Sequence, residues 1–322
     1  MLTVRSFAKI NLGLAIGPLR PDGFHELRTI YQTIALHDII RVSVTRGVGI
    51  EIRCPDPRVP KDQSNTCYRI VERAMSALKA RGRVIIEIEK RLPVQGGLGG
   101  ASGNAVATLL GLERALKKAL PDAERLRIAA EVGSDVPLFL LGGTVLGVGR
   151  GEEVCPLPDL PAIPCVVATP DIAVSTPKAF ADWDAHGALT PASPSDRLLM
   201  FSRNMSAWLN SQDIYGRASS GVPAGKRRGR AGTPLLDLVR AGIENDFEQV
   251  VFPQYPELRE VKRVLELAGA FYASLSGSGA AIYGLFASRE KAGKAAARLV
   301  KMGIPAVATA SLTRRQYWRK FR

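Results

Sequence analysis

The sequence is poor in the residues that build metal centres and disulfide frameworks. It has four cysteines and three histidines among 322 residues, and no two cysteines form a C-x-x-C pair. These counts argue against a zinc site and a disulfide scaffold, and they predict buried free thiols. The chain also lacks any run of about 18 apolar residues and any basic-then-apolar N-terminal pattern, so we expect a cytoplasmic protein without a membrane partner.

Acidic residues are also few relative to basic ones. The chain has 30 Asp and Glu against 44 Lys and Arg, which gives a net charge of +14. Such an excess is typical of nucleic-acid-binding proteins. However, residues 217–230 and 314–322 each hold five basic residues and no acid, which leaves +4 for the remainder of the chain. We therefore expect two exposed basic segments, and no specific nucleic-acid partner.

The order of the predicted elements favours an α+β protein. Alternating apolar residues predict a strand over 3–16 and a hairpin formed by 39–44 and 48–53. A helical pattern begins at Asn65 and extends to about residue 79. Strands followed by helices on one side of them predict an α+β arrangement for this half of the chain.

The length of the chain and its 46% hydrophobic content allow two domains, each with a core. The proline-rich segment 156–164 predicts a linker, which gives domains of residues 1–157 and 158–322. The pattern after the linker suits a sheet with helices on one side. Residues 187–232 are polar, with glycine and serine concentrated around 216–232, where we expect a disordered or mobile loop. Helical patterns over 196–209 and 235–242 flank this loop.

A glycine-rich segment at 93–104, PVQGGLGGASGN, follows an expected strand and precedes an expected helix over 105–120. Glycine permits positive φ and close approach of backbone N–H groups to a ligand. A helix N-terminus adds unpaired donors and a partial positive charge. The segment therefore predicts an anion site, most often a nucleotide polyphosphate. A tight turn in which glycine only eases packing is the alternative.

The pattern P-x-x-x-G-L-G-G-x-S in this segment resembles the phosphate loop of the GHMP small-molecule kinases, which include galactokinase, homoserine kinase and mevalonate kinase. Two further segments, SFAKINL at 6–12 and LSGSGAA at 275–281, are similar to the first and third motifs of that superfamily. Finer features are similar to the family of 4-diphosphocytidyl-2-C-methylerythritol kinases, and they lie at 22–27, 133–139, 174–177 and 245–248. The resemblance extends from about residue 3 to about residue 309, apart from 187–233.

The resemblance implies a two-domain GHMP kinase fold. An N-terminal domain like domain 2 of ribosomal protein S5 and a C-terminal ferredoxin-like α/β sandwich would flank an active-site cleft. It implies ATP as co-substrate, Mg²⁺, and transfer of phosphate to the 2-hydroxyl of 4-diphosphocytidyl-2-C-methylerythritol in the non-mevalonate isoprenoid pathway. It is also compatible with a monomer or a weak homodimer. The alternatives are a GHMP kinase for a sugar, homoserine or mevalonate, and a non-catalytic RNA-binding member of the fold.

Lys9 lies in an otherwise apolar stretch, where a half-buried lysine needs an anionic partner. The resemblance makes Asp135 that partner and implies that both residues are catalytic. Because Pro137 follows closely, Asp135 could instead cap a helix. The resemblance also implies that the glycine segment binds ATP, with Ser102 as the candidate Mg²⁺ contact; the segment comprises Pro93, Val94, Gln95, Gly96, Gly97, Leu98, Gly99, Gly100, Ala101, Ser102 and Gly103.

Phe24 and His25 stand where the resembled family has a Tyr–His pair that sandwiches and hydrogen-bonds a cytosine ring. Phe24 can stack as tyrosine does but cannot donate a hydroxyl hydrogen bond. Without the resemblance, an aromatic–histidine pair favours packing, and Thr176 favours a helix cap. With it, the expected substrate-binding residues are Asn11, Phe24, His25, Thr176, Phe180, Gly277, Ser278 and Gly279.

Overall fold

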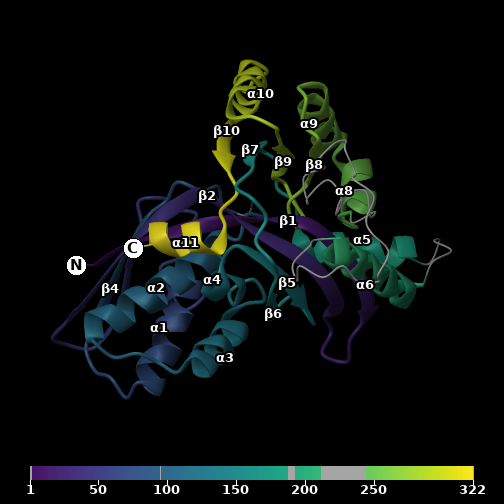
Figure 1. The fold of residues 1–322 in the computed structure, drawn as a ribbon. Coiled ribbons are helices and arrows are strands. Elements are labelled where there is room, and N and C mark those ends of the chain that lie inside the picture. Colours follow the sequence, from purple (N-terminus) through teal and green to yellow (C-terminus); the bar gives the residue numbers. More distant parts are fainter. Residues whose placement is uncertain (1, 95, 188–192, 212–243, 322) are drawn as a thin grey trace, which may run out of the picture.

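The structure is a computed structural model that describes residues 2–94, 96–187, 193–211 and 244–321. Its strands form two sheets (Figure 1). The larger sheet has the order β3-β4-β2-β5-β6, with β1 also paired to β2, and consists of β1 (Leu2–Leu19), β2 (His25–Thr45), β3 (Gly49–Arg53), β4 (Arg83–Glu89), β5 (Thr144–Val148) and β6 (Glu153–Pro156). The smaller sheet has the order β10-β7-β9-β8 and consists of β7 (Pro164–Ala168), β8 (Tyr272–Leu275), β9 (Ile282–Leu285) and β10 (Ala306–Ala310).

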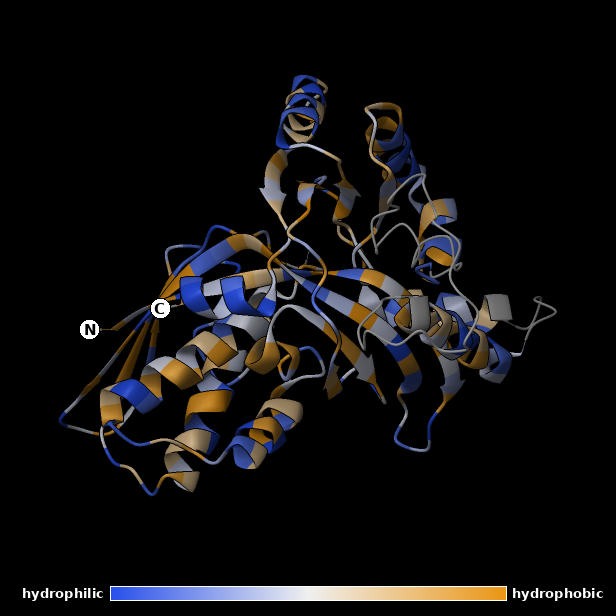
Figure 2. Cartoon of the chain, viewed as in Figure 1, coloured by the Kyte–Doolittle hydropathy of each residue, from blue (hydrophilic) through white to orange (hydrophobic). Residues whose placement is uncertain are grey.

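Helices cover both sheets. In Figure 1 the larger sheet is covered by α1 (Thr66–Ala77), α2 (Gly100–Leu116), α3 (Asp122–Val132) and α4 (Leu138–Leu141). The smaller sheet contacts α9 (Pro256–Leu267) and α10 (Arg289–Lys301). The other helices are α5 (Thr176–Gly187), α6 (Pro194–Ser211), α8 (Glu248–Gln254) and α11 (Arg314–Phe321). Figure 2 shows polar residues over much of α10, whose buried face is small and apolar.

The predicted hairpin over 39–53 is wrong. Strand β4 lies between β2 and β3: Ile40 of β2 faces Ile88 in an antiparallel register, and Ile50 of β3 faces Val84 in a parallel one. A parallel pair requires a crossover, and α1 supplies it between β3 and β4. Val84, Ile86 and Ile88 of β4 are all buried, so β4 occupies an interior position of the sheet, between β2 and β3. In a hairpin, β3 would have occupied that position next to β2.

The basic C-terminal segment is not an exposed tail. Residues 314–321 form α11, and the rings of Tyr317 and Phe321 join the core of the larger sheet together with Phe7. Arg319 and Lys320 stay exposed on the other side of the helix. The prediction of an exposed segment was wrong because it was based on the basic residues, which outnumber the aromatic residues in 314–322. The packing of α11 is determined by those aromatic residues. The other basic segment, 217–230, lies outside the described residues.

Two more expectations concern the middle of the chain. Residues 157–163 connect β6 to β7 without regular structure, as a linker would, and the domain boundary at 157/158 stays a prediction. The helix expected over 196–209 is confirmed as α6, whereas 188–192, 212–232 and the helix expected over 235–242 lie outside the described residues. All four cysteines are free, and Cys155 is exposed, unlike the other three.

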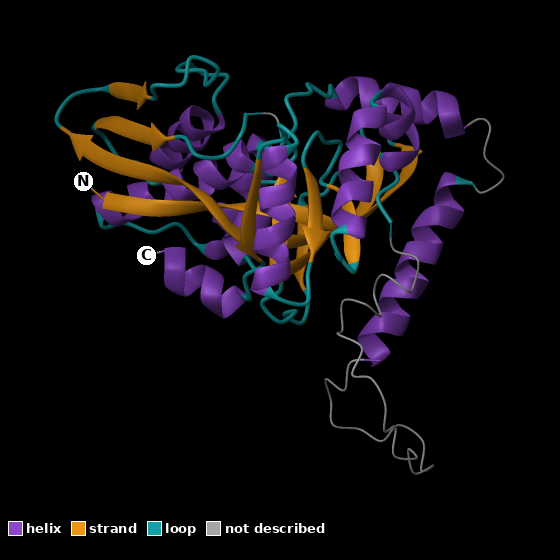
Figure 3. Ribbon diagram, turned by 90° about the horizontal axis from the view of Figure 1, so that it is seen from above, coloured by secondary structure: helices purple, strands orange, loops and turns teal. Residues whose placement is uncertain are grey.

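The long strands β1 and β2 connect the two halves of the molecule. In Figure 3, β1 runs from the N-terminus into the centre of the molecule. Its first half packs in the core of the larger sheet through Val4 and Phe7. Further along, Leu14 and Ile16 join the core beneath the smaller sheet. The middle of β1, residues 8–12, is therefore placed where both halves meet.

Candidate active site

The glycine segment forms a loop that ends in the N-terminus of α2. Gly97 and Gly99 have φ of +71° and +67°, in the left-handed region where a side chain is strained. A Cβ at Gly99 would lie 3.0 Å from Cγ of Lys9, so the backbone also passes too close to β1 for a larger residue. Gly99 caps α2 without a side-chain hydrogen bond, which leaves the first N–H groups of the helix without an intrahelical acceptor.

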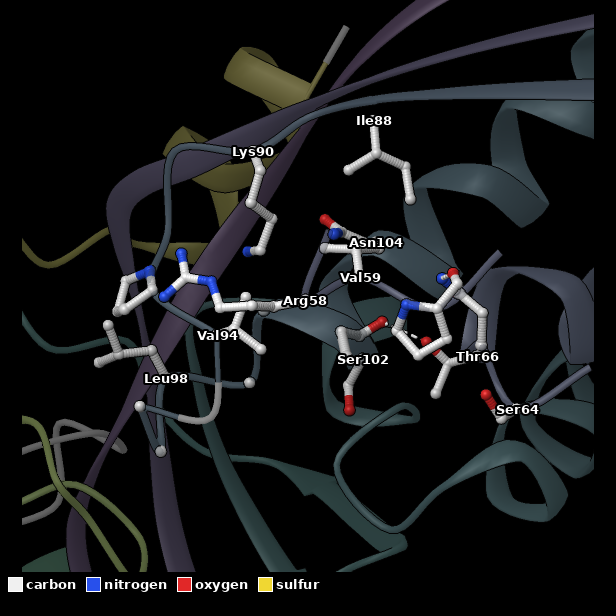
Figure 4. Close-up of a pocket in the computed structure, with 18 residues that line it drawn as sticks. Arg58, Val59, Ser64, Thr66, Ile88, Lys90, Val94, Leu98, Ser102 and Asn104 are labelled. Atoms are coloured by element: carbon white, nitrogen blue, oxygen red, sulfur yellow. Dashed lines mark hydrogen bonds between the residues drawn. The ribbon is translucent and has the colours of Figure 1, made fainter. Parts of the chain in front are cut away.

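A pocket of about 340 Å³ opens beside this loop (Figure 4). Its wall includes residues 93, 94 and 96–102 of the loop, together with Asn65 before α1 and Asn104 of α2. It also includes side chains that the sequence did not single out: Arg58, Val59, Pro60, Ser64, Thr66, Ile88 and Lys90. The Thr66 hydroxyl donates to the carbonyl of Ala101 at 2.7 Å, which fixes the start of α1 against the start of α2. The pocket therefore combines an apolar wall, the cationic side chains of Arg58 and Lys90, and the backbone N–H groups at the start of α2.

A buried carboxylate holds the strand that enters the loop. Asp38 has no exposed surface, and Lys90 Nζ lies 2.7 Å from its Oδ2. The backbone N–H groups of Arg91 and Leu92 each donate to Oδ1 at 2.7 Å. Asn104 of α2 donates to Oδ2 at 3.0 Å. Asp38 therefore fixes Lys90 and Asn104, both at the same carboxylate oxygen, in the pocket wall, and these contacts stabilise a buried charge that would otherwise be costly.

Lys9 and Asp135 meet beside the glycine loop. Lys9 Nζ lies 3.3 Å from Asp135 Oδ2, and the lysine is only 3% exposed whereas the Asp135 side chain is 32% exposed. Lys9 also donates to Asn11 Oδ1 at 2.7 Å, and Asn11 donates in turn to the Thr29 hydroxyl at 2.8 Å. The buried ammonium is thus fully oriented, while its carboxylate partner still faces solvent.

Asp135 does not cap a helix. The N-cap of α4 is Pro137, which has no side-chain cap hydrogen bond. Instead, Asp135 Oδ1 accepts a hydrogen bond of 2.9 Å from the hydroxyl of Tyr31, a buried residue of β2. Burial, together with the nearby Asp135 carboxylate, raises the pKa of Tyr31 well above its usual value. The phenol therefore stays protonated and acts as a donor.

The second glycine loop, between β8 and β9, packs directly against the first. Ser276 donates its hydroxyl to the Gly97 carbonyl at 3.0 Å, and the Ala281 N–H donates to the Gly96 carbonyl at 3.2 Å. A Cβ at Gly277 would lie 3.4 Å from Lys9 Nζ. Three segments that are remote in the sequence, around residues 9, 97 and 277, are therefore in contact.

The polar side chains of 245–246 hold this second loop and β1 in place. Asn245 donates to the carbonyls of Leu275 and Gly277 at 2.9 and 2.8 Å. Asp246 accepts from the Ile16 N–H at 2.9 Å and pairs with Arg197 of α6 at 2.8 Å. Burial raises the pKa of the Asp246 carboxyl to about 6 in spite of these contacts. The cost of burying this acid is therefore incurred where Asp246 joins β1 to α6.

An aromatic stack lies where β2 begins. His25 and Phe180 of α5 stack with centroids 4.9 Å apart and an interplanar angle of 7°. His25 Nε2 lies 2.7 Å from Oδ1 of Asp184, also of α5. Phe24 is 51% exposed, and the Arg150 guanidinium lies 5.0 Å from its ring centroid. His25 and Phe180 therefore stack on each other with the histidine buried and bonded to Asp184, while Phe24 is exposed beside Arg150.

Thr176 extends the site to the second glycine loop. Its hydroxyl lies 2.7 Å from that of Ser278, although the two residues are 102 positions apart in the chain. Thr176 is the first residue of α5 and is exposed. The contact joins the helix that carries Phe180 to the loop that contacts Gly97. Of the predicted substrate residues, Thr176 and Ser278 are therefore in contact, and Gly277 lies beside Lys9.

Comparisons with known proteins identify the family. The profile described as the GHMP kinases N terminal domain matches residues 65–143, and the one described as GHMP kinases C terminal matches 232–304. A curated 4-diphosphocytidyl-2-C-methyl-D-erythritol kinase from Solibacter usitatus is 41% identical over 286 residues, which is 89% of this chain and 81% of the relative. The chain belongs to this kinase family. A second member, from Acaryochloris marina, is 36% identical over 90% of this chain and 88% of its own length.

Solved structures agree with membership of the kinase family. A crystal structure of 4-(cytidine 5'-diphospho)-2C-methyl-D-erythritol kinase matches with a TM-score of 0.71 and 28% identity, covering 96% of this chain and 99% of that chain. A homoserine kinase from Cytophaga hutchinsonii matches with a TM-score of 0.70 at 21% identity, covering 97% of this chain and 95% of its own, which shows a shared fold. The two-domain α+β GHMP kinase fold is confirmed.

The sequence motifs located the loops and the ion pair of this family member but missed their supports. Asp38 holds the pocket and Lys90 lines it, yet both lie in an ordinary strand pattern. Tyr31 and Asp184 were missed for the same reason. Within the described parts of the chain, no cluster of three or more His, Cys, Asp or Glu could hold a metal ion, and no helix is long and apolar enough to cross a membrane.

Proposed function

We propose that the chain transfers the γ-phosphoryl group of ATP to the 2-hydroxyl of 4-diphosphocytidyl-2-C-methyl-D-erythritol, giving the 2-phosphate and ADP in the non-mevalonate route to isoprenoid precursors. The observation that carries the proposal is the buried Lys9, 3.3 Å from a solvent-facing Asp135, at the junction of two glycine loops. Membership of the kinase family supports both the reaction and the substrate.

The pocket beside the first glycine loop suits ATP. The unpaired N–H groups at the start of α2, at Gly100, Ala101 and Ser102, would bind phosphate oxygens, and the positive end of the helix favours their charge. Lys90 and Arg58 add cationic groups to the same pocket. The remaining residues of the loop over 93–103 would supply the wall, as the sequence predicts.

Mg²⁺ would be held mainly by phosphate oxygens of the nucleotide, with the Ser102 hydroxyl as a protein contact. The absence of an acidic cluster in the described residues fits this, because Mg²⁺ is often bound through substrate phosphates and few protein ligands. When bound, it supplies neutralisation of phosphate charge.

The ion pair activates the acceptor alcohol. The hydroxyl oxygen attacks the γ-phosphorus, the bond from that phosphorus to the β–γ bridging oxygen breaks, and the hydroxyl proton passes to Asp135. Lys9 lies 3.3 Å from Asp135 Oδ2, close enough to stabilise negative charge that develops near it. Asn11 and Thr29 fix the ammonium, so the alignment is built before substrate binds.

The aromatic stack at the start of β2 accounts for the base of the substrate. Phe24 offers an exposed planar face. Phe180 stacks on His25, whose Nε2 faces Asp184, so contacts of Phe180 and His25 with a cytosine stay predictions. Thr176, Gly277, Ser278 and Gly279 lie along the route from this stack to Lys9 and would contact the rest of the substrate. The polar atoms of Asn11 are occupied by Lys9 and Thr29, so a direct substrate contact from Asn11 stays a prediction.

The test is phosphorylation of a panel of alcohols by the purified chain. ADP release should depend on 4-diphosphocytidyl-2-C-methyl-D-erythritol and not on mevalonate or homoserine. A preference for either of the latter would assign another activity of the fold. Salt-sensitive RNA binding without ADP release would support the non-catalytic alternative.

We also propose a cytoplasmic monomer or weak homodimer without a specific nucleic-acid or membrane partner, which sedimentation and fractionation would test.

A further inference from the structure

Tyr31 contacts the side of Asp135 that Lys9 leaves open. The carboxylate has two oxygens: Oδ2 lies 3.3 Å from Lys9 Nζ, and Oδ1 accepts from the Tyr31 hydroxyl at 2.9 Å. The Tyr31 ring also lies beside the ammonium, with its centroid 5.7 Å from Lys9 Nζ. Ammonium and phenol together restrict the rotation of the carboxylate about its own axis. Tyr31 lies outside the three superfamily motifs at 6–12, 93–104 and 275–281.

The surrounding backbone is shaped to hold the phenol in this place. A Cβ at Gly147 of β5 would lie 2.5 Å from Cε2 of Tyr31, and one at Gly151 would collide with its hydroxyl. Gly147 faces Thr29 in the strand pairing, next to the pair formed by Val145 and Tyr31. Gly147 and Gly151 therefore leave the space that the Tyr31 side chain occupies, which we call the slot. The Gly151 carbonyl is also near the phenol but more distant, at 3.4 Å, so the hydroxyl is directed to Asp135.

We propose that Tyr31 is a positioning residue of the phosphoryl-transfer site: its phenol holds the Asp135 carboxylate in the orientation in which Asp135 accepts the substrate proton. This inference rests on the proposed function. Since the phenol is buried and its pKa is raised well above its usual value, it remains a donor over the working pH range. A simple packing role is the alternative, in which the ring fills the core and the hydroxyl does not matter.

Tyr31→Phe separates the two roles because it keeps the ring and removes only the hydroxyl. We expect kcat to fall about 10-fold or more, since a hydrogen bond to a charged group is lost, while KM for both substrates changes less than about twofold. Tyr317→Phe is the matched control: it also loses a buried hydroxyl hydrogen bond, of 2.7 Å but to the neutral Phe139 carbonyl, and should keep its kcat.

A double-mutant cycle shows whether Tyr31 acts through Asp135. In single-turnover assays with an Asp135→Asn background, the further change Tyr31→Phe should alter the residual rate by less than about twofold. The same fractional loss in both backgrounds would overturn the inference, as would an unchanged kcat in Tyr31→Phe or a loss confined to KM. If Tyr31→Phe does not fold, Gly147→Ala displaces the phenol instead, and an unchanged kcat there has the same meaning.

These outcomes are distinct from failure of the proposed function. A wild-type chain that phosphorylates no alcohol refutes the function and with it the role of Tyr31. A wild-type chain that phosphorylates the cytidylyl alcohol, together with a fully active Tyr31→Phe variant, refutes the role of Tyr31 alone.

Discussion

Replacing Lys9 by methionine removes the charge that the site depends on while keeping most of the side chain. At the observed 3.3 Å and an effective dielectric constant of about 20, the attraction between Lys9 and Asp135 is roughly 5 kcal/mol. The Asp135 side chain is 32% exposed, so solvent screening reduces this figure, and we take about 3 kcal/mol as the loss in the transition state. That loss corresponds to a fall in kcat of about 10²-fold.

The same change has a smaller effect on folding. It leaves the buried Asn11 Oδ1 without its donor, which costs about 1–3 kcal/mol, but it also removes a buried ammonium that was costly to desolvate. We therefore expect a folded variant whose unfolding free energy is lower by no more than about 2 kcal/mol. Its affinity for ATP should be close to wild type, because Lys9 lies behind the glycine loop and does not line the pocket.

The assay is steady-state ADP release with saturating substrates, combined with calorimetry for ATP binding and thermal unfolding. Lys262→Met is the matched control, since Lys262 is partly buried and paired with Glu248 at 2.6 Å, but lies on α9. A kcat within about twofold of wild type for Lys9→Met would refute the electrostatic argument, because a lost charge pair of this size cannot be silent.

Three further changes test other parts of the account. Gly97→Ala should weaken ATP binding about 10-fold or more in calorimetry, because a Cβ at φ +71° is strained and would lie 3.0 Å from the Gly279 carbonyl; unchanged affinity would show that the loop can shift. Burial raises the pKa of Asp246 from 3.8 to about 6, so ionisation of this carboxyl destabilises the folded state. The destabilisation is absent below about pH 4 and complete above about pH 6. The unfolding free energy of wild type minus that of Asp246→Asn should therefore fall between pH 4 and 6 in denaturant titrations, and a rise would reverse the sign of our argument. Phe321→Ala should lower the unfolding free energy by about 3 kcal/mol if α11 is part of the core, whereas an exposed tail would give no change.

The chemistry of this site was predictable because it depends on backbone that only glycine can form. Gly97 and Gly99 need left-handed φ, and a lysine in an apolar strand needs an anion. Such requirements leave visible marks in a sequence. Lys9 and Asp135 meet as predicted, at 3.3 Å, and both glycine loops are in contact beside them.

The supports of the site were not predictable because their sequence patterns are common. Tyr31 alternates with its neighbours as any buried strand residue does, and its value comes from the slot made by Gly147 across the sheet. Asp38 has no distinctive pattern around it in the sequence. It contacts Lys90 only because β4 pairs with β2, which places the end of β4 beside it. The same strand insertion defeated the hairpin prediction, since local alternation does not say which strand is the neighbour.

The most direct test of the central claim is a comparison of wild type with Asp135→Asn, which removes the proton acceptor and keeps the shape of the side chain. ATP affinity by calorimetry should be unchanged, while transfer to 4-diphosphocytidyl-2-C-methyl-D-erythritol, measured as labelled phosphate in the product, should fall by at least about 10²-fold. Equal transfer by both proteins would contradict the claim that Asp135 and Lys9 form the catalytic pair.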